Sequence, residues 1–193
     1  SEPVGSSGAI PVENSFTNRD KVSTLTYSWF MEARTLHAPL DALSAANRPQ
    51  GIEIATLTTF DIPALAVLTL EAYDEAVTPE ALMETSEELR LTFEGAFGDT
   101  TEDSFVGAWD GGTLVGAILV VRESPWDDAP DGPFVVDLIV APDYRRRGIA
   151  TALVSEVASR CTHWGFDTLA LRLDARHGGA RELYSMLGFE EIA

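Results

Sequence analysis

One stretch in the last third of the chain constrains the fold more than any other. Phe134–Val140 is an apolar run with the length and β-branched content of a buried strand, and Pro142 follows it. Over residues 149–161, apolar residues recur every three or four positions, which predicts a helix with one wide apolar face. Between the two lie Arg145, Arg146, Arg147 and then Gly148. The sequence therefore predicts a strand, a tight turn and a helix.

The turn before residue 149 has the chemistry of a phosphate site. The first amide groups of a helix have no acceptor within the helix, and the helix dipole adds partial positive charge there. Gly148 allows a close approach of the backbone, and the arginines add full charges. The alternative is an ordinary turn on a basic surface. Because the chain holds 31 acidic residues against 13 basic ones, three consecutive arginines favour the phosphate site.

The same residues resemble a known signature. Arg145-x-x-Gly148-x-Ala150, preceded by Leu138-x-Val140-x-Pro142, resembles the acetyl-CoA motif of the GNAT superfamily of N-acetyltransferases. The resemblance covers roughly residues 51–193 and implies acetyl-CoA as cosubstrate. The residues that it implies for binding acetyl-CoA are Leu138, Ile139, Val140, Arg145, Arg146, Arg147, Gly148, Ile149, Ala150 and His177.

A second motif lies in residues 180–189, where Leu183-Tyr184 precedes Gly188-Phe189. It resembles the other landmark of the GNAT family, except that His177 stands where the family usually has an asparagine that touches acetyl-CoA. In the family, a tyrosine at the position of Tyr184 often gives a proton to the departing CoA thiolate. The resemblance therefore implies that Tyr184 is a general acid.

The implied reaction also needs a base, because an amine with a pKa near ~10.4 is mostly protonated at neutral pH. Asp137 is the candidate, since a carboxylate on an apolar strand is costly without a partner. A structural hydrogen-bonding role for Asp137 is the alternative, and the sequence does not decide between the two.

The order of elements predicts a mixed α/β fold of the GNAT type. Strands are expected at residues 52–57, 105–109, 113–122, 134–140 and 168–174, with helices after residues 61, 78, 148 and 179. The second of these helices is expected to run toward Phe97, with Gly98 near its end. The family resemblance implies a mostly antiparallel sheet, splayed between the fourth and fifth of these strands. Only five residues follow Gly188, so at least the last strand of the family fold is missing. Residues 24–30, from this chain or from a dimer mate, are the candidate replacement.

Composition limits the partners and the setting. A breaker cluster at residues 47–51 divides the chain into an extension, 1–49, and a domain, 50–193. The net charge of −18 argues against nucleic acid as a partner and suits a cationic amine. Between Asp61 and Asp103 there are twelve acidic residues and one basic residue. No apolar run has the length of a membrane span, no signal peptide is recognisable and there is one cysteine, so we expect a cytoplasmic protein. The three histidines lack the spacing of metal ligands, so no metal is expected.

Two functions follow from these observations. The first is an acetyl-CoA-dependent N-acetyltransferase that acts on a primary amine of a small molecule or a protein by direct attack. The second is a non-catalytic module of the same fold that binds acyl-CoA. The presence of Tyr184 favours the enzyme, whereas His177 and the missing strand leave room for the binding module. The sequence does not name the acceptor amine or the length of the acyl chain.

Overall fold

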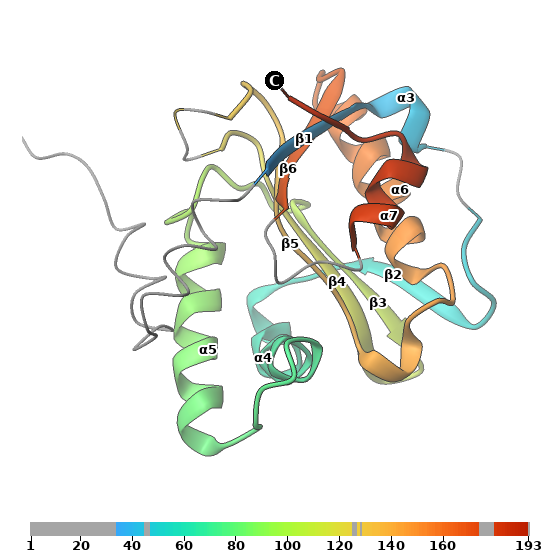
Figure 1. Cartoon of the computed structure of the whole chain (residues 1–193). Helices are drawn as coiled ribbons and strands as arrows, with labels where there is room; N and C mark the ends of the chain where they lie inside the picture. Colours follow the sequence, from blue (N-terminus) through green and yellow to red (C-terminus); the bar gives the residue numbers. More distant parts are fainter. Residues whose placement is uncertain (1–33, 45–46, 125–126, 128, 174–179, 193) are drawn as a thin grey trace, which may run out of the picture.

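The computed structural model describes residues 34–44, 47–124, 127, 129–173 and 180–192 (Figure 1). The predictions for residues 24–30 and for His177 fall outside these ranges. The strands are β1 (Arg34–Pro39), β2 (Ile52–Thr56), β3 (Phe105–Asp110), β4 (Thr113–Val121), β5 (Phe134–Val140), β6 (Thr168–Leu173) and β7 (Glu190–Glu191). The helices are α3 (Leu40–Leu43), α4 (Ile62–Ala72), α5 (Pro79–Phe93), α6 (Ile149–His163) and α7 (Ala180–Leu187), with 3-10 turns η1 (Thr59–Asp61) and η2 (Pro142–Tyr144). Among these described helices, none has the length and apolar character needed to cross a bilayer.

The strands form one seven-stranded sheet in the order β2-β3-β4-β5-β6-β1-β7. Every neighbouring pair is antiparallel except β5 and β6, which are parallel. The predicted mixed, mostly antiparallel α/β fold is therefore confirmed. The helix predicted to run from residue 79 toward residue 97 is shorter than expected and ends at Phe93. Gly95 follows with a φ of +88°, a left-handed conformation that commonly terminates helices.

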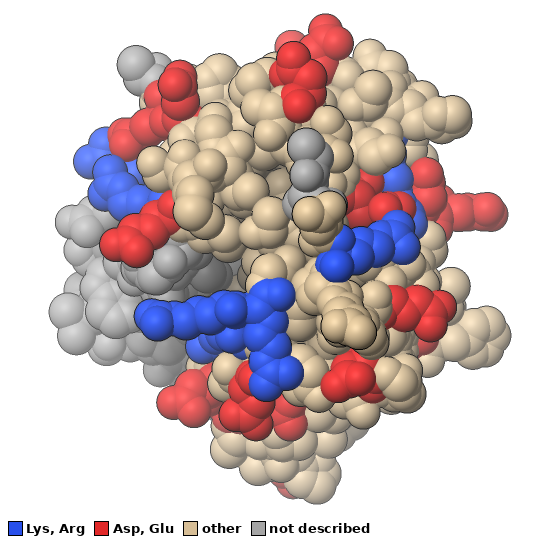
Figure 2. All heavy atoms as spheres, turned by 90° about the vertical axis from the view of Figure 1, so that its right-hand side faces the viewer, with Lys and Arg blue, Asp and Glu red and all other residues tan. Residues whose placement is uncertain are grey.

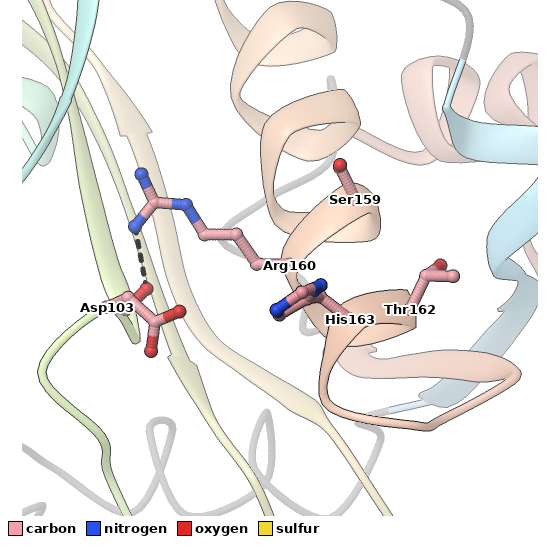
Figure 3. Close-up of a pocket in the computed structure, with 5 residues that line it drawn as sticks. All are labelled: Asp103, Ser159, Arg160, Thr162 and His163. Carbon is pink, nitrogen blue, oxygen red and sulfur yellow. Dashed lines mark hydrogen bonds between the residues drawn. The ribbon is translucent and has the colours of Figure 1, made fainter.

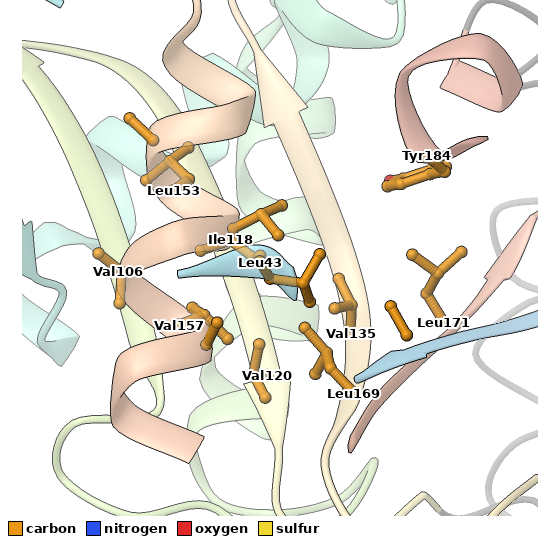
Figure 4. Close-up of a cluster of buried hydrophobic side chains, with 14 of the residues drawn as sticks. Leu43, Val106, Ile118, Val120, Val135, Leu153, Val157, Leu169, Leu171 and Tyr184 are labelled. Atoms are coloured by element: carbon orange, nitrogen blue, oxygen red, sulfur yellow. The ribbon is translucent and has the colours of Figure 1, made fainter. Parts of the chain in front are cut away.

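Helices cover both faces of the sheet (Figure 1). On one face, α3, α6 and α7 pack on alternate residues of the central strands, among them Ile118 and Val120 (Figure 4). On the other face, α4 and α5 pack on the intervening residues of β4, Ala117 and Leu119. The alternation along β4 is the two-residue period of a strand that is buried on both sides.

The N-terminal part of the described chain supplies one strand of the sheet. β1 lies between β6 and β7, and its residues from Arg34 to Pro39 pair with β6 in antiparallel register. Leu36 and Ala38 are buried in the core beneath α6 and α7, and Ala38 is fully buried. The expectation that residues 24–30 fill a place in the sheet stays a prediction, and the strand at residues 34–39 was not predicted. The division of the chain at residue 49 stays a prediction, and β1 belongs to the same sheet as the later strands.

A glycine in β4 sets the position of the helix that follows the basic turn. A Cβ atom at Gly116 would lie 2.8 Å from Cγ2 of Ile149, the first residue of α6, and 3.2 Å from Cδ1 of Leu153. Any larger residue would push the start of α6 away from the sheet. The absence of a side chain at Gly116 therefore lets the N-terminus of α6 sit directly on β4, next to the end of β5.

Candidate active site

Strand β5 is irregular at the point where the site begins. Against β4, Leu119 pairs with Asp137 and Val120 pairs with Val135, so Val136 is an extra residue in a β-bulge. Against β6, only Phe134 and Val135 are paired. Beyond Val135 the two parallel strands part, as the family resemblance implied. From residue 136 onward, none of the strands that the structure describes pairs with this edge of β5, which we call the open edge.

The backbone of β5 offers alternate residues to that open edge. The amide of Ala141 donates a hydrogen bond of 2.8 Å to the carbonyl of Val115 in β4. Because backbone groups of successive strand residues point to opposite edges, those of Ile139 also point to β4. Those of Leu138 and Val140 point to the open edge. Of the three predicted residues, Leu138 and Val140 thus present backbone groups there, whereas Ile139 does not.

The turn between β5 and α6 has an unusual backbone. Arg146 has a φ of +62° and Gly148 has a φ of +81°, both in the left-handed region. Among the described residues, no acceptor is found for the amides of Arg146, Arg147 and Gly148, and the start of α6 has no side-chain cap. A Cβ atom at Gly148 would meet only Cγ of Pro49, at 3.9 Å. The turn therefore presents several amides without a described acceptor, and amides arranged in this way are able to bind phosphate oxygens.

The three arginines of the turn have different environments, although all are exposed. Arg145 holds the turn in place: Nε donates to the carbonyl of Val140 at 3.2 Å, and Nη2 donates to the carbonyl of Ala72 at 2.8 Å. The guanidinium of Arg147 lies 4.8 Å from the centre of the Tyr144 ring, a cation–π arrangement. Arg145 therefore has a structural role that the sequence did not reveal, and its guanidinium is partly committed to these carbonyls.

Charge on the face that carries α6 and α7 is unevenly distributed (Figure 2). Basic side chains lie there in several groups, and acidic side chains lie around these groups and directly beside some of them. In a chain with a net charge of −18, a local group of cations is a departure from the average surface. Such a group attracts anionic ligands.

Tyr184 lies on α7 and reaches toward β5 (Figure 4). The side chain is buried, and its ring packs edge-to-face with that of Phe189, with centroids 5.5 Å apart. Burial raises the pKa of the Tyr184 phenol well above its usual value, and the negative charge of Asp137 raises it further. The phenol is therefore protonated throughout the neutral range and is able to donate a hydrogen bond or a proton.

Asp137 has a partner that the sequence did not suggest. The hydroxyl of Tyr73, the residue that follows α4, donates to Oδ1 of Asp137 at 2.6 Å. Asp137 pairs with Leu119 and lies on the same face of the sheet as Ile139, toward α4. The carboxylate is half-buried. The two roles considered for Asp137 both remain open, because a hydrogen-bonded carboxylate can also accept a proton.

The structure brings most of the predicted residues to one end of β5. Leu138, Val140, the basic turn and the start of α6 are contiguous, and Tyr184 approaches from α7. Ile149 contributes only its amide, because its side chain is 1% exposed and packs in the core. Ala150 is half-buried in the first turn of α6. His177 lies outside the described residues. Tyr73 was missed, and no local sequence pattern distinguishes it from a tyrosine that ends any amphipathic helix.

The single cysteine takes no part in this site. Burial raises the pKa of Cys161 to about 12, with a further contribution from the charge of Asp103. The side chain is fully buried in the core on α6. A thiol of this kind stays protonated and unreactive at neutral pH.

A shallow pocket lies elsewhere, near the C-terminal end of α6 (Figure 3). Asp103, Ser159, Arg160, Thr162 and His163 line it. Arg160 donates to the carbonyl of Asp103 and to Thr56, at 2.8 Å in each case. Its charged groups are therefore used to join α6 to β2 and to the loop before β3. From the rise of 1.5 Å per residue, Ser159 is about 15 Å along α6 from the basic turn, so this pocket is separate from the site at β5.

Solved structures of acetyltransferases share the fold. The chain aligns with the GCN5-related N-acetyltransferase from Sphaerobacter thermophilus with a TM-score of 0.60 and 22% identity, over 89% of this chain and 54% of that one. It spans about half the length of that relative. The ribosomal-protein-S18-alanine N-acetyltransferase from Escherichia coli gives a TM-score of 0.55 and 21% identity, over 74% of this chain and 79% of that one. An aminoglycoside antibiotic 6'-N-acetyltransferase from Acinetobacter baumannii gives a TM-score of 0.57 and 19% identity, over 74% of this chain and 93% of that one.

Comparison at the level of sequence gives the family. No curated protein matches the chain significantly. The model of the acetyltransferase (GNAT) family, whose members use acetyl-CoA, matches residues 68–189. These residues include β5, the basic turn, α6 and α7 and make up more than half of the chain. The chain therefore belongs to the GNAT family of acetyltransferases.

Proposed function

We propose that this protein is an acetyl-CoA-dependent N-acetyltransferase. The observation that carries the proposal is the turn from Arg145 to Gly148, where unpaired backbone amides, two left-handed residues and exposed guanidinium groups meet the start of α6 at the open edge of β5. Backbone amides, a helix N-terminus and cations are the groups that bind a diphosphate. Membership of the GNAT family supports the same conclusion.

The described residues fit acetyl-CoA. The amides of the turn and the side chains of Arg146 and Arg147 would hold the diphosphate. Backbone groups of Leu138 and Val140 on the open edge of β5 would hold the pantetheine arm and polarise the thioester carbonyl. When bound, acetyl-CoA supplies an acetyl group on a good leaving group, so an amine can take the acetyl group directly and CoA departs as the thiol. No covalent intermediate with the protein is needed.

Two side chains would move the protons. Asp137 would accept a proton from the acceptor ammonium, directly or through a water molecule, because only a neutral amine attacks a carbonyl. Tyr184 would give a proton from its hydroxyl to the departing sulfur. The carboxylate and the phenol belong to different faces of the sheet, and Asp137 lies two residues beyond Val135, the last residue of β5 that pairs with β6. This arrangement would let the acceptor approach from the α4 side.

The acceptor in this proposal is a cationic primary amine of a small molecule or a protein. The segment from Asp61 to Asp103, which carries α4 and α5, holds twelve acidic residues and one basic residue. Arg90 pairs with Glu87 and Glu94, so these two carboxylates are partly neutralised. The relatives described above include proteins named for acetylating aminoglycosides and a ribosomal protein, both of which present amines. A cytoplasmic location is part of the proposal.

A second function, acyl-CoA binding without transfer, is favoured by one observation. His177 stands where the family usually has an asparagine that contacts acetyl-CoA. A screen of thiol release from acetyl-CoA against polyamines, aminoglycosides, peptide N-termini and neutral amines separates the two functions. Amine-dependent release of CoA, together with a product that carries one acetyl group, supports the enzyme. Binding of acetyl-CoA without release on any amine supports the binding module.

A further inference from the structure

The end of α4 contacts both halves of the proposed site. The carbonyl of Ala72, the last residue of α4, accepts a hydrogen bond of 2.8 Å from Nη2 of Arg145 in the basic turn. The hydroxyl of the next residue, Tyr73, donates a hydrogen bond of 2.6 Å to Oδ1 of Asp137 on β5. Two consecutive residues therefore connect one helix end to the turn and to the carboxylate, which lie eight positions apart in the chain.

The local structure gives Tyr73 a fixed position. Its amide donates to the carbonyl of Thr69 at 3.2 Å, which continues the hydrogen-bond pattern of α4 by one residue. Its ring is half-buried and packs against the core between α4 and the sheet. Asp137 directly follows the bulged residue Val136, and a bulge turns the following side chain out of its regular direction. A bulged strand alone does not fix a carboxylate, and the hydrogen bond from the Tyr73 phenol constrains its direction.

We propose that Tyr73 is a positioning residue that holds the Asp137 carboxylate in line with the basic turn. The inference rests on the proposed function, in which Asp137 accepts the proton of the acceptor amine. A carboxylate that accepts a hydrogen bond is still able to take up a proton, because each carboxylate oxygen has two lone pairs. Arg145 and Tyr73 thus tie the turn and the base to the same rigid helix end, and proton transfer depends on such alignment.

The hydrogen bond also has an electrostatic consequence. A bond donated to a carboxylate favours its charged form, so loss of the Tyr73 hydroxyl makes Asp137 easier to protonate. The elements packed against β5 carry other ionisable groups, whereas β4 has none: Glu71 on α4, Arg172 on β6, Arg181, Glu182 and Tyr184 on α7, and Glu156, Arg160, Cys161 and His163 on α6, which covers the opposite face of the sheet from Asp137. Tyrosine and arginine do not titrate in acid. A shift of the acidic limb that disappears when Asp137 is replaced by asparagine is therefore the part that reports on the Asp137 carboxylate.

The test compares Tyr73→Phe with Thr92→Val. Both changes remove one hydrogen-bonding hydroxyl and keep the shape of the side chain. Thr92→Val is the control, because the Thr92 hydroxyl donates to the carbonyl of Glu88 at 2.8 Å within α5, and the proposed mechanism does not use this hydrogen bond. In Tyr73→Phe we expect kcat to fall about tenfold or more and the acidic limb to move to higher pH by about one unit, with an unchanged KM for acetyl-CoA. Thr92→Val should keep the profile of the original protein.

A second comparison uses Asp137→Asn as the background. If Tyr73 acts through Asp137, adding Tyr73→Phe to Asp137→Asn causes no further loss of kcat. An unchanged kcat and an unchanged acidic limb in Tyr73→Phe would overturn the inference, and so would a full additional loss in the double variant.

The test also separates this inference from the proposed function. If the original protein transfers no acetyl group to any amine, the proposed function fails. The titration of Asp137, followed by nuclear magnetic resonance of its side-chain carboxyl carbon, then decides the positioning role. A midpoint that moves to higher pH in Tyr73→Phe shows that the phenol controls the carboxylate, and an unmoved midpoint overturns the inference.

Discussion

Tyr184 and Asp137 belong to opposite faces of the sheet, and the charge of Asp137 adds to the effect of burial in raising the pKa of the Tyr184 phenol. Tyr184 comes from α7 and Asp137 from β5, next to the point where β5 and β6 stop pairing. A proton donor and a carboxylate on opposite faces of the sheet can serve a leaving group and an attacking amine separately. The leaving group would then lie on the α7 side and the amine on the α4 side.

The electrostatic link between the two residues predicts the behaviour of Asp137→Asn. Removing the negative charge should lower the pKa of Tyr184, which nevertheless stays above its usual value because burial is the larger cause. A titration of the Tyr184 ring by nuclear magnetic resonance, with labelled tyrosine, measures the change. If the Tyr184 midpoint is the same with and without the Asp137 charge, the two groups are not coupled.

Tyr184→Phe tests the proposed general acid. The change keeps the ring that packs on Phe189 and removes only the hydroxyl. Turnover should fall by roughly 10²-fold, the usual scale of general acid catalysis, while the affinity for acetyl-CoA changes little. Assays of thiol release measure the turnover, and calorimetry measures the affinity for acetyl-CoA. Full turnover in the Phe variant would remove Tyr184 from the mechanism and leave the family assignment standing.

The same substitution has an effect on stability at high pH. A phenol whose pKa is raised in the folded state contributes stability that is complete below its unfolded value of about 10 and is lost as the pH rises through the folded value. Tyr184→Phe should therefore lose less of its free energy of unfolding above about pH 10 than the original protein does. If the two proteins lose the same free energy of unfolding at alkaline pH, the titration of Tyr184 does not cause that loss.

Strand β1 predicts a contrast between two neighbouring residues. Ala38 is fully buried beneath α6 and α7, whereas His37, on the other side of the strand, is exposed. Ala38→Asn places an amide in the core and should lower the free energy of unfolding by about 2–4 kcal/mol, while His37→Asn should change it by about 0.5 kcal/mol or less. Chemical denaturation measures both. Similar, small effects would indicate that β1 does not pair with β6 in solution.

The sequence predicted the parts of the fold that depend on local patterns. The strand before Ala141 and the helix from Ile149 were found at their expected positions, because an apolar run and a helical repeat are encoded within a few residues. The pairing of Thr35 with Arg172 was not predictable, because no local pattern states which distant strand lies beside another. The expected helix end at residue 97 was too late, because it rested on Gly98, whereas α5 ends at Phe93 and the left-handed Gly95 follows.

The candidate site was predictable to a similar degree. The basic turn and Tyr184 carry recognisable motifs, so they were found from the sequence. The bond between Tyr73 and Asp137 joins residues 64 positions apart, and the bond of Arg145 to Ala72 spans 73. Such contacts arise only when α4 packs on β5, so they required the structure.

The central claim is that the turn before α6 binds the diphosphate of acetyl-CoA. A comparison of Gly148→Glu with Gly165→Glu tests it most directly. The two glycines flank the same helix, both have a left-handed φ (+81° and +94°), and a Cβ atom at either meets no atom within 3.8 Å. The backbone strain of the two substitutions is therefore similar, and only Gly148→Glu places a carboxylate among the unpaired amides.

Calorimetric titration with acetyl-CoA, on variants whose melting temperatures show that they are folded, gives the result. We predict that Gly148→Glu weakens the affinity by roughly tenfold or more, as expected for loss of hydrogen bonds to a charged group, and that Gly165→Glu binds like the original protein. Equal affinities for acetyl-CoA in the original protein and in folded Gly148→Glu would contradict the account.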